Sequence, residues 1–417
     1  MSQAGDSGRS AMGKVPARAD TARPRVVHLT GDFPDPIEPD KTTAIRQLID
    51  LTADRFDHTV VSLNRRAPEP AALAGWLGRR LEVVAAPFEY GLTAQYRAPP
   101  AGVFHAAMLE RLGDWLAERL AAAPGPKPSL IVGHKLTIEG IAVRRAAARM
   151  NIPYALSIQG NTDERILRVR PDLAPLLGKV LHGAATVFPF TPWALEAVVK
   201  RLGTPTPPPR ILPCATELDT PISPRAQGNG LVTAFHLRNW QTKNFDRTVA
   251  ALTQVRRQGR STRLAVLGGG DGPSARRCRE IGDATPGVTF EGPLAHADMP
   301  GRLNAATALV MPSRRESFGL VFIEALFAGI PIVYPAGQGV DGFFDNAEFA
   351  VRVDARSTAA IAAAMMHVVD HEPRLKAALA EWQRGPEARR FQRAAISRQF
   401  ADGLEAAIAS RETLPAA

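Results

Sequence analysis

Short apolar runs alternate with helix-like stretches along most of this chain, and this alternation constrains the fold more than any other feature. Each run has the length and residue types of a buried strand, while the stretches between them carry apolar residues at helical spacing. Such alternation predicts parallel α/β sheets. The runs fall into two series: residues 26–29, 58–63, 81–84, 130–132, 154–158 and 185–188, then 231–235, 264–267, 288–290, 308–311 and 332–334.

Two proline-rich segments separate the two series. Thr204-Pro-Thr-Pro-Pro-Pro209 and Pro221-Ile-Ser-Pro224 are typical of turns, so a linker is expected between residues 204 and 229. A chain of 417 residues also exceeds the size at which one hydrophobic core usually suffices. The sequence therefore predicts two Rossmann-like α/β domains, residues 24–215 and 225–385, with a cleft between them.

The formal charge of +10 suits nucleic acid, an anionic membrane or a phosphorylated substrate. No nucleic-acid motif is present, so nucleic acid is not expected as a partner. Arginine pairs such as Arg65-Arg66 and Arg389-Arg390 adjoin apolar helical residues. Peripheral contact with an anionic membrane and a fully solvated surface both remain open for them.

Cysteine content and apolar run lengths indicate the compartment. Cys214 and Cys278 are the two cysteines, which argues against a disulfide framework, and they lack zinc-ligand spacing. No apolar run reaches the roughly 20 residues that span a bilayer, and the N-terminus lacks a signal-peptide core. Residues 1–23 have the composition of a disordered tail. The protein is expected in the cytoplasm, free or at the inner face of the membrane.

The segment from Met311 to Pro335 predicts a βαβ unit. The run that ends at Pro312 is strand-like, residues 319–328 repeat apolar positions at helical spacing, and Gly329 with Pro331 ends the helix. In such units the loop after the first strand lies at the ligand-binding edge of the sheet. The first backbone N–H groups of the helix can hold an anion there.

Two glutamates flank this predicted helix start. Glu316 lies in the loop, whereas Glu324 lies more than one turn into the helix on an otherwise apolar face, where an unpaired carboxylate is costly. A hydroxyl-bearing ligand would satisfy Glu324. The alternative is structural: Glu316 favours the positive helix end, and Glu324 pairs with Arg314 or Arg315.

The whole segment resembles the donor-binding segment of family 4 retaining glycosyltransferases. The resemblance lies in Pro312-Ser313, Glu316-Ser-Phe-Gly319, Glu324-Ala325 and Gly329-Ile-Pro331, and it extends loosely from about residue 25 to 400. Because that family has the GT-B fold, the resemblance implies two Rossmann-like domains facing a cleft. It also implies a C-terminal helix, residues 386–411, that crosses back to the first domain.

Arg238 and Lys243 follow the strand at 231–235 and match the arginine and lysine that this family places five residues apart. The resemblance implies that both bind the donor diphosphate. Fixed cations stabilise the charge that gathers on a leaving nucleoside diphosphate, so no metal is expected. Exposed surface cations are the alternative.

The resemblance implies further donor contacts in the second domain. Glu324 would bind ribose hydroxyls, and Glu316 would bind the sugar together with the backbone of Ser317, Phe318, Gly319 and Leu320. The glycine-rich turn at 268–272 resembles the family's nucleotide-side loop, and residues 288–293 resemble the next segment, which usually lines the base pocket. Gly268, Gly270 and Gly292 are therefore donor-side candidates. A tight strand-to-helix turn without a ligand is the alternative reading.

The first domain matches the family less closely. Lys41 stands in a loop where the family often has a glycine pair, and either contacts phosphate or stiffens the surface. His134 is expected to face the cleft, although a lone histidine is more often structural. Gln159 replaces a histidine that touches the transferred sugar in many relatives. Asp163 is the nearby candidate for contact with the acceptor.

These features together predict a metal-independent, retaining glycosyltransferase. It would move a sugar from a nucleotide-diphosphate sugar to a glycan or lipid-linked acceptor, in bacterial polysaccharide or glycoconjugate synthesis, without any other cofactor. Two alternatives remain: a nucleotide-sugar 2-epimerase of GT-B fold, and a non-catalytic GT-B partner subunit. The sugar, the base and the acceptor's identity are left open.

Overall fold

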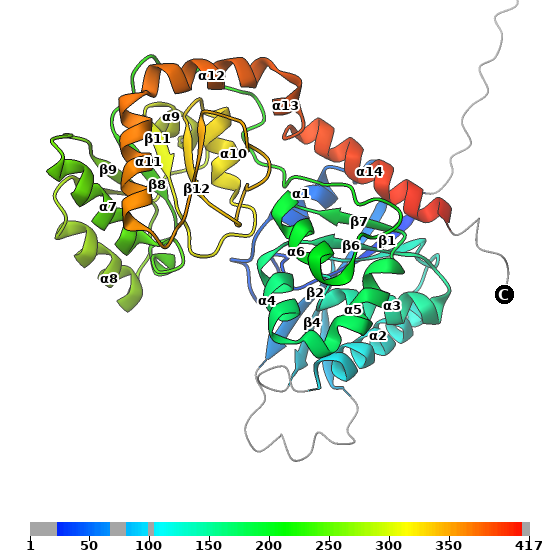
Figure 1. Ribbon diagram of the computed structural model, residues 1–417. Helices are drawn as coiled ribbons and strands as arrows, with labels where there is room; N and C mark the ends of the chain where they lie inside the picture. Colours follow the sequence, from blue (N-terminus) through cyan, green and yellow to red (C-terminus); the bar gives the residue numbers. More distant parts are fainter. Residues whose placement is uncertain (1–22, 67–80, 99–103, 411–417) are drawn as a thin grey trace, which may run out of the picture.

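The computed structural model describes residues 23–66, 81–98 and 104–410, and these ranges contain two sheets, each in its own α/β domain (Figure 1). All but the last residue of the predicted N-terminal tail lies outside these ranges. None of the helices in the described ranges is long and apolar enough to cross a membrane.

The first sheet has the strand order β3-β4-β2-β1-β5-β6-β7. Its strands are β1 (Arg25–Thr30), β2 (Asp57–Arg66), β3 (Val83–Phe88), β4 (Gly91–Arg97), β5 (Leu130–Gly133), β6 (Tyr154–Ile158) and β7 (Thr186–Pro189). Its helices are α1 (Ala44–Asp50), α2 (His105–Ala122), α3 (Glu139–Met150), α4 (Asn161–Val169), the 3₁₀ helix η3 (Pro171–Leu173), α5 (Ala174–His182) and α6 (Pro192–Leu202).

One edge of this sheet differs from the fully parallel prediction. β3 and β4 form an antiparallel hairpin, and β4 then pairs in parallel with β2. The predicted strand at residues 81–84 is therefore wrong in its bounds, and β4 was not predicted. Gly91, at φ 145°, lies so close to β2 that a Cβ would sit 2.4 Å from the Val60 carbonyl oxygen, so glycine is required where the hairpin returns.

The second sheet is parallel throughout, in the order β10-β9-β8-β11-β12-β13. Its strands are β8 (Leu231–Ala234), β9 (Leu264–Leu267), β10 (Val288–Gly292), β11 (Ala308–Val310), β12 (Ile332–Pro335) and β13 (Ala350–Val353). Its helices are the 3₁₀ helix η4 (Leu237–Asn239), α7 (Phe245–Arg257), α8 (Gly272–Asp283), α9 (Met299–Asn304), α10 (Leu320–Phe327) and α11 (Thr358–Asp370). The predicted βαβ unit is confirmed as β11-α10-β12, while β13 was not predicted.

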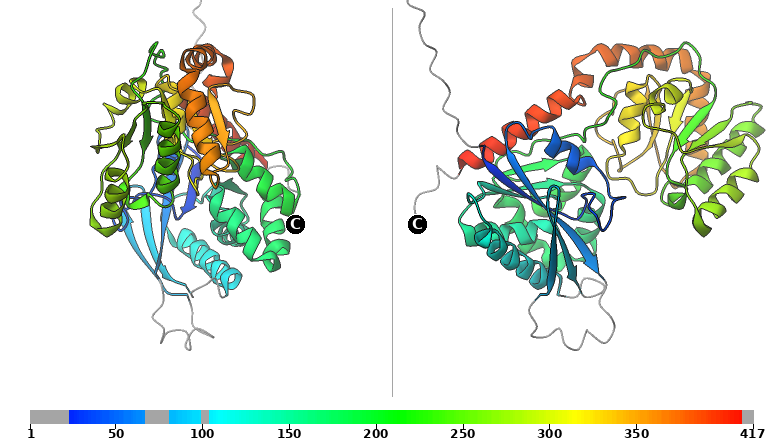
Figure 2. Two further views of the ribbon diagram at one scale, coloured as in Figure 1. Left: turned by 60° about the vertical axis from the view of Figure 1, so that its left-hand side comes forward. Right: turned by 180° about the vertical axis from the view of Figure 1, so that it is seen from behind.

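The C-terminal helices return the chain to the first domain, as predicted (Figures 1 and 2). They are α12 (Glu372–Arg384), α13 (Pro386–Arg389) and α14 (Arg393–Ala409). Phe400 of α14 is fully buried against Phe188 of β7, with ring centroids 5.2 Å apart. Ser397 donates a hydrogen bond to the Leu51 carbonyl at 2.7 Å, which fixes α14 beside α1.

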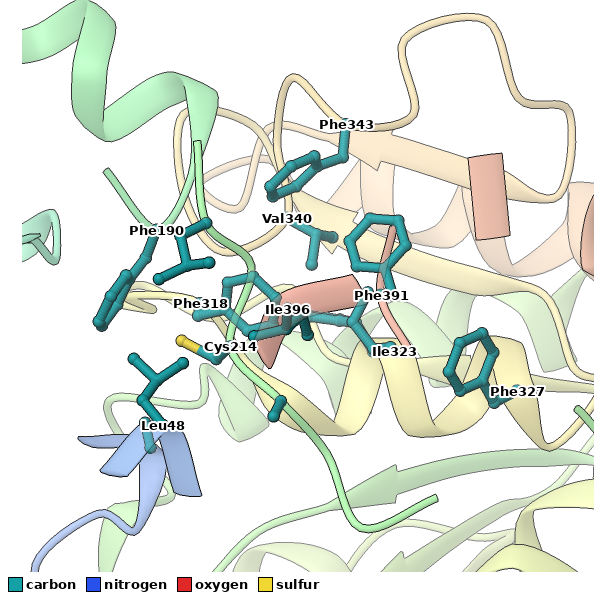
Figure 3. Close-up of a cluster of buried hydrophobic side chains, with 14 of the residues drawn as sticks. Leu48, Phe190, Cys214, Phe318, Ile323, Phe327, Val340, Phe343, Phe391 and Ile396 are labelled. Atoms are coloured by element: carbon teal, nitrogen blue, oxygen red, sulfur yellow. The ribbon is translucent and has the colours of Figure 1, made fainter. Parts of the chain in front are cut away.

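A single buried hydrophobic cluster joins the two domains (Figure 3). It contains Leu48 and Phe190 of the first domain, Phe318 and Ile323 of the second, and Phe391 before α14. Because these side chains leave water together, the cluster stabilises the relative position of the domains.

Two hydrogen bonds between the domains also fix their relative orientation, which apolar packing alone does not specify. Asn161 Nδ2 donates to Ser317 Oγ at 3.1 Å, and Trp193 Nε1 donates to the Gly339 carbonyl at 2.8 Å. The loop before α10 and the loop after β12 are thereby held against α4 and α6 of the first domain.

Candidate active site

A pocket of about 640 Å³ lies between the two domains, where the carboxyl ends of strands from both sheets meet. The first-domain wall consists of Asp32, Thr42, Ala44, Lys135, Gln159, Thr162 and Phe190, with Cys214 from the linker. The second-domain wall consists of Ala234, Phe235, His236, Lys243, Arg315, Glu316, Ser317, Phe318, Gly319, Leu320, Val321 and Glu324. This is the edge at which open α/β sheets bind ligands.

The loop between β11 and α10 forms most of the second-domain wall. Gly319 caps α10 with φ 77°, and a Cβ there would lie 2.7 Å from the Phe322 ring, so only glycine fits without displacing that buried side chain. The backbone of Glu316 is held twice: its N–H donates to Gln338 Oε1 at 2.9 Å, and its carbonyl accepts from Gly339 N–H at 3.0 Å. The predicted residues 316–320 therefore lie on a braced loop at the pocket wall.

Lys243 and Glu316 meet in this pocket. Lys243 Nζ lies 2.5 Å from Glu316 Oε2, and the two side chains are 19% and 11% exposed. Glu316 Oε2 also accepts from Ser313 Oγ at 3.3 Å. The structure thus brings together a lysine after β8 and a glutamate after β11, two strands that are neighbours in the sheet.

Asn244 positions Lys243 and was missed in the sequence. Its backbone is left-handed at φ 60°, and its buried amide donates to the carbonyls of Pro312 at 3.0 Å and Ala355 at 2.6 Å. These bonds tie the start of α7 to the end of β11, next to the loop that carries Glu316. The available signal was an asparagine directly before a helix, because asparagine tolerates the left-handed conformation.

Glu324 lies between the pocket and a smaller recess lined by Glu217 and His296. Burial raises the pKa of Glu324, an effect that nearby His296 opposes and Glu217 reinforces. Among the described residues no ion pair or side-chain hydrogen bond to Glu324 is found. Pairing with Arg314 is ruled out, since Arg314 binds Asp246 at 2.6 Å.

Arg238 is not part of the pocket wall. Its side chain is 52% exposed, and its guanidinium lies 3.7 Å from Asp40 of the first domain. The sequence spacing predicted that Arg238 and Lys243 lie together, but Arg238, within η4, stays at the rim, while Lys243, after η4, turns inward to Glu316.

The predicted glycines lie behind the pocket wall. A Cβ on Gly268 would sit 2.0 Å from the Phe235 carbonyl oxygen, and a Cβ on Gly270 would sit 2.6 Å from the His236 ring. Phe235 and His236 line the pocket, so these glycines let the neighbouring loop pass behind them. Gly292, at φ 79°, ends β10 and does not line the pocket.

Of the four first-domain candidates, the structure brings only Gln159 to the pocket wall. Lys41 is 10% exposed, and its ammonium donates to Asp35 at 3.1 Å and Asn64 at 2.8 Å, so it closes its own loop. Asp163 is buried in α4 and accepts two hydrogen bonds from Thr137, which turns it away from an acceptor.

His134 does not face the cleft as predicted, because it belongs to a buried chain of hydrogen bonds. Ser157 Oγ, His134, His28, His58 and Thr52 Oγ1 are linked in that order at 2.9–3.1 Å. The Thr52 hydroxyl donates to a backbone carbonyl one turn earlier, so it accepts from His58. Because each neutral ring has one donor and one acceptor nitrogen, this fixes the direction of every hydrogen bond in the chain. Every ring donates from Nε2 and accepts at Nδ1, and every imidazole is neutral.

Burial lowers the pKa values of these histidines, since a charged imidazole is poorly solvated there. The pKa of His58 falls to about 4 and that of His134 to about 3, and the pKa of His28 falls well below its ordinary value. The chain of histidines therefore has a structural role beneath the first sheet's ligand edge.

Asp32 and Lys135 are pocket residues that sequence reasoning missed. Asp32 follows β1 and Lys135 follows β5, and these strands are adjacent and parallel. Lys135 Nζ lies 2.6 Å from Asp32 Oδ2. The signal was present: charged residues directly after two strands of a parallel sheet meet at its carboxyl edge.

Within residues 23–66, 81–98 and 104–410 no group of three or more His, Cys, Asp or Glu side chains is arranged to hold a metal ion. The charged groups of the pocket are instead two ion pairs, Lys243–Glu316 and Lys135–Asp32, together with Arg315 and Glu324. Such an arrangement can bind phosphate and hydroxyl groups on opposite sides of one ligand.

The sequence matches to known proteins fall mainly in the second domain. Residues 230–371 match the family model described as Glycosyl transferases group 1. Glycogen synthase of Mycobacterium tuberculosis (strain CDC 1551 / Oshkosh) is 33% identical over 133 residues, which is 31% of this chain and 31% of the relative. D-inositol 3-phosphate glycosyltransferase of Corynebacterium kroppenstedtii is 31% identical over 152 residues, 35% of this chain and 33% of the relative. The match thus spans about a third of these relatives.

Solved structures resemble nearly the whole chain. Sucrose-phosphate synthase from Thermosynechococcus elongatus has a TM-score of 0.67 at 18% identity, over 93% of this chain and 100% of that one. Anabaena Alr3699/HepE, solved with UDP and glucose, has a TM-score of 0.59 at 16% identity, over 91% and 99%. The chain has the GT-B fold, and residues 230–371 match the Glycosyl transferases group 1 family model.

Proposed function

We propose that this protein is a metal-independent, retaining glycosyltransferase that moves a sugar from a nucleotide-diphosphate sugar to a glycan or lipid-linked acceptor. The observation that carries the proposal is the pocket in which the Lys243–Glu316 pair, the capped start of α10 and the half-buried carboxylate of Glu324 converge. The names of the matched relatives, a glycogen synthase and an inositol phosphate glycosyltransferase, support sugar transfer.

In the proposed complex the donor lies along the second-domain wall. The ribose hydroxyls donate to Glu324, whose half-buried carboxylate has no ion pair or side-chain hydrogen bond among the described residues, and this hydrogen bonding lowers the cost of its desolvation. The sugar lies against Glu316 and the backbone of residues 317–320. The diphosphate lies between the N-terminus of α10 and the cations, with Lys243 nearest and Arg238 reaching in from the rim.

The chemistry follows from where charge develops. As the bond between sugar and diphosphate breaks, negative charge gathers on the leaving phosphate, and Lys243 and Arg238 stabilise that charge. Glu316 keeps the Lys243 ammonium at the wall. The acceptor hydroxyl attacks from the side of the departing phosphate, which takes the hydroxyl proton, so the anomeric configuration is retained.

The acceptor enters from the first domain, where Asp32, Thr42, Lys135, Gln159 and Thr162 supply polar groups. Gln159 can donate to and accept from sugar hydroxyls, but it cannot take up a proton as a histidine would. The proposed mechanism therefore assigns no proton transfer to residue 159.

Thermal-shift measurements with UDP, GDP and their sugars test the donor assignment. A nucleotide that binds the folded state raises the melting temperature, and the rise grows with the ratio of its concentration to its Kd. We expect a shift with one nucleotide series, in the presence of EDTA, that is lost in Lys243→Ala. Stabilisation by other ligands but by neither nucleotide series would contradict the proposal, and an epimerised donor without acceptor would identify an epimerase.

A further inference from the structure

The first-domain wall carries one ion pair, between Asp32 and Lys135, that faces the second-domain wall. Both residues line the pocket, with side chains 30% and 12% exposed. Lys135 is the only cation among the described first-domain residues of that wall. Its ammonium already binds Asp32 at 2.6 Å, so its positive charge is neutralised by that carboxylate. A ligand at this wall therefore contacts the Asp32 carboxylate rather than an unpaired ammonium.

Two further carboxylates lie behind this pair. Glu139, from the first turn of α3, is 1% exposed: its Oε1 accepts from the Gly31 N–H at 2.7 Å, while its Oε2 has no partner. Asp163 is likewise 1% exposed, and its Oδ2 has no partner. Burial raises the pKa of both, to about 7 for Glu139.

Lys135 interacts electrostatically with all three carboxylates. Burial lowers its pKa, but Glu139, Asp32 and Asp163 outweigh that effect, and the pKa of Lys135 is raised above its ordinary value. The Lys135 ammonium therefore contacts Asp32 directly, and the carboxyl groups of Glu139 and Asp163 lie behind it. The wall is negative or neutral at neutral pH, never positive, which disfavours a phosphate or carboxylate on the group that docks there.

We propose that the Asp32–Lys135 pair is the hydroxyl-binding group of the acceptor subsite, and that it selects an uncharged, hydroxyl-rich reacting end over a phosphorylated one. Asp32 accepts from acceptor hydroxyls, and the ion pair with Lys135 holds the Asp32 carboxylate in place. Thr162 and Gln159, which line the same wall of the pocket, supply neutral donors and acceptors of the kind that suit a sugar or polyol.

This inference rests on the proposed glycosyltransferase function but can fail separately from it. Donor binding depends on the second-domain wall, so it is measured first, by the thermal shift that the stabilising nucleotide produces. The acceptor subsite is then measured by transfer from the matching nucleotide sugar to pairs of acceptors: glucose with glucose 6-phosphate, mannose with mannose 6-phosphate, and myo-inositol with inositol 3-phosphate.

For the wild-type protein, transfer to the free sugar or polyol is expected to exceed transfer to its phosphate by at least about tenfold in kcat/KM, because like charges brought together across an interface are strongly disfavoured. A preference for the phosphorylated member, or transfer to none of the free compounds, overturns the inference while leaving donor binding intact.

Asp32→Asn tests the pair itself. It keeps the size of the side chain and removes its charge, so the KM for the neutral acceptor should rise about tenfold, and the preference over the phosphate should shrink by a similar factor. The nucleotide's thermal shift should stay as in wild type. Unchanged acceptor KM and unchanged preference would show that the pair has only a structural role.

Asp172→Asn is the matched control. Asp172 is a surface residue whose side chain is 59% exposed and binds Arg170, so the variant changes the net charge of the first domain by the same amount away from the pocket. Its acceptor preference should equal that of wild type. A loss of preference in this control would assign the effect to overall charge and contradict a role for Asp32.

Discussion

Lys243 Nζ and Glu316 Oε2 lie 2.5 Å apart in a pocket between two domains, although 73 residues separate them in the chain. The contact exists because β8 and β11 are neighbours, and the loops that follow them leave the sheet at the same edge. An ammonium held in this way is already positioned before any ligand arrives. Such preorganisation makes fixed charges effective in stabilising a transition state.

Lys243→Ala tests this cation directly. In the proposed mechanism, its removal leaves the departing diphosphate without its nearest positive charge, so kcat should fall by about 10²–10³. Steady-state sugar transfer measures the effect, with Lys200→Ala on the exposed face of α6 as the control that keeps wild-type kcat. A Lys243→Ala enzyme with unchanged kcat would remove Lys243 from the mechanism.

Glu324→Gln tests the ribose contact. A hydrogen bond to a charged group contributes about 1.5–3 kcal/mol, so the affinity for the stabilising nucleoside diphosphate should fall at least about tenfold. Affinity for its 2′,3′-dideoxy counterpart should hardly change, because that ligand lacks the hydroxyls. Calorimetry measures the affinity of wild type and Glu324→Gln for each of the two ligands. An equal loss of affinity for both ligands would show that Glu324 contacts a part of the donor other than the ribose hydroxyls.

The sequence predicted the second domain well for physical reasons. The strand, the helix start and the helix end around α10 follow from local periodicity and from Gly319, Gly329 and Pro331, all of which act within a few residues. That Lys243 and Glu316 lie at one edge of the sheet followed from the rule that loops after parallel strands share one edge, but their ion pair was not predicted.

The first domain was predicted less well because its candidates have distant partners. Lys41 is turned away from the cleft by Asn64, and His134 by His28 across 106 residues, so no local pattern records either contact. The position of Asp32 at the end of β1 could be predicted from the sequence. Its role in the pocket depends on Lys135, which only the pairing of β1 with β5 brings next to it.

The buried histidines make stability dependent on pH. Their folded-state pKa values lie below the ordinary 6.5, so the unfolded chain binds more protons, and the stability they contribute is present above pH 6.5 and lost as the pH falls toward 4. In His58→Gln the free energy of unfolding should decline less steeply over that window, by up to about 1.4 kcal/mol per pH unit.

Thr52→Val is the matched control for that experiment. It breaks the same chain of hydrogen bonds at the Thr52 hydroxyl but removes no titrating group. Urea unfolding at pH 4.5, 5.5 and 6.5 should show a constant loss of stability in Thr52→Val and a changed slope only in His58→Gln. Equal slopes in wild type and His58→Gln would contradict the neutral tautomers assigned to the chain.

Phe400→Ala tests how α14 holds the first domain. Phe400 is fully buried against Phe188, and truncating such a side chain costs about 3–5 kcal/mol. Urea unfolding should show that loss, whereas Val169→Ala, at a position 60% exposed, should change stability by less than about 0.5 kcal/mol. A loss below about 1 kcal/mol in Phe400→Ala would mean that α14 packs loosely in solution.

The stereochemistry of the product tests the central claim most directly. ¹H NMR of the anomeric proton, recorded during transfer from an α-linked nucleotide sugar in the presence of EDTA, should show an α-linked product that forms together with free nucleoside diphosphate. A β-linked product would contradict retention, and activity that disappears with EDTA and returns with a divalent cation would contradict the assignment of charge stabilisation to Lys243 and Arg238.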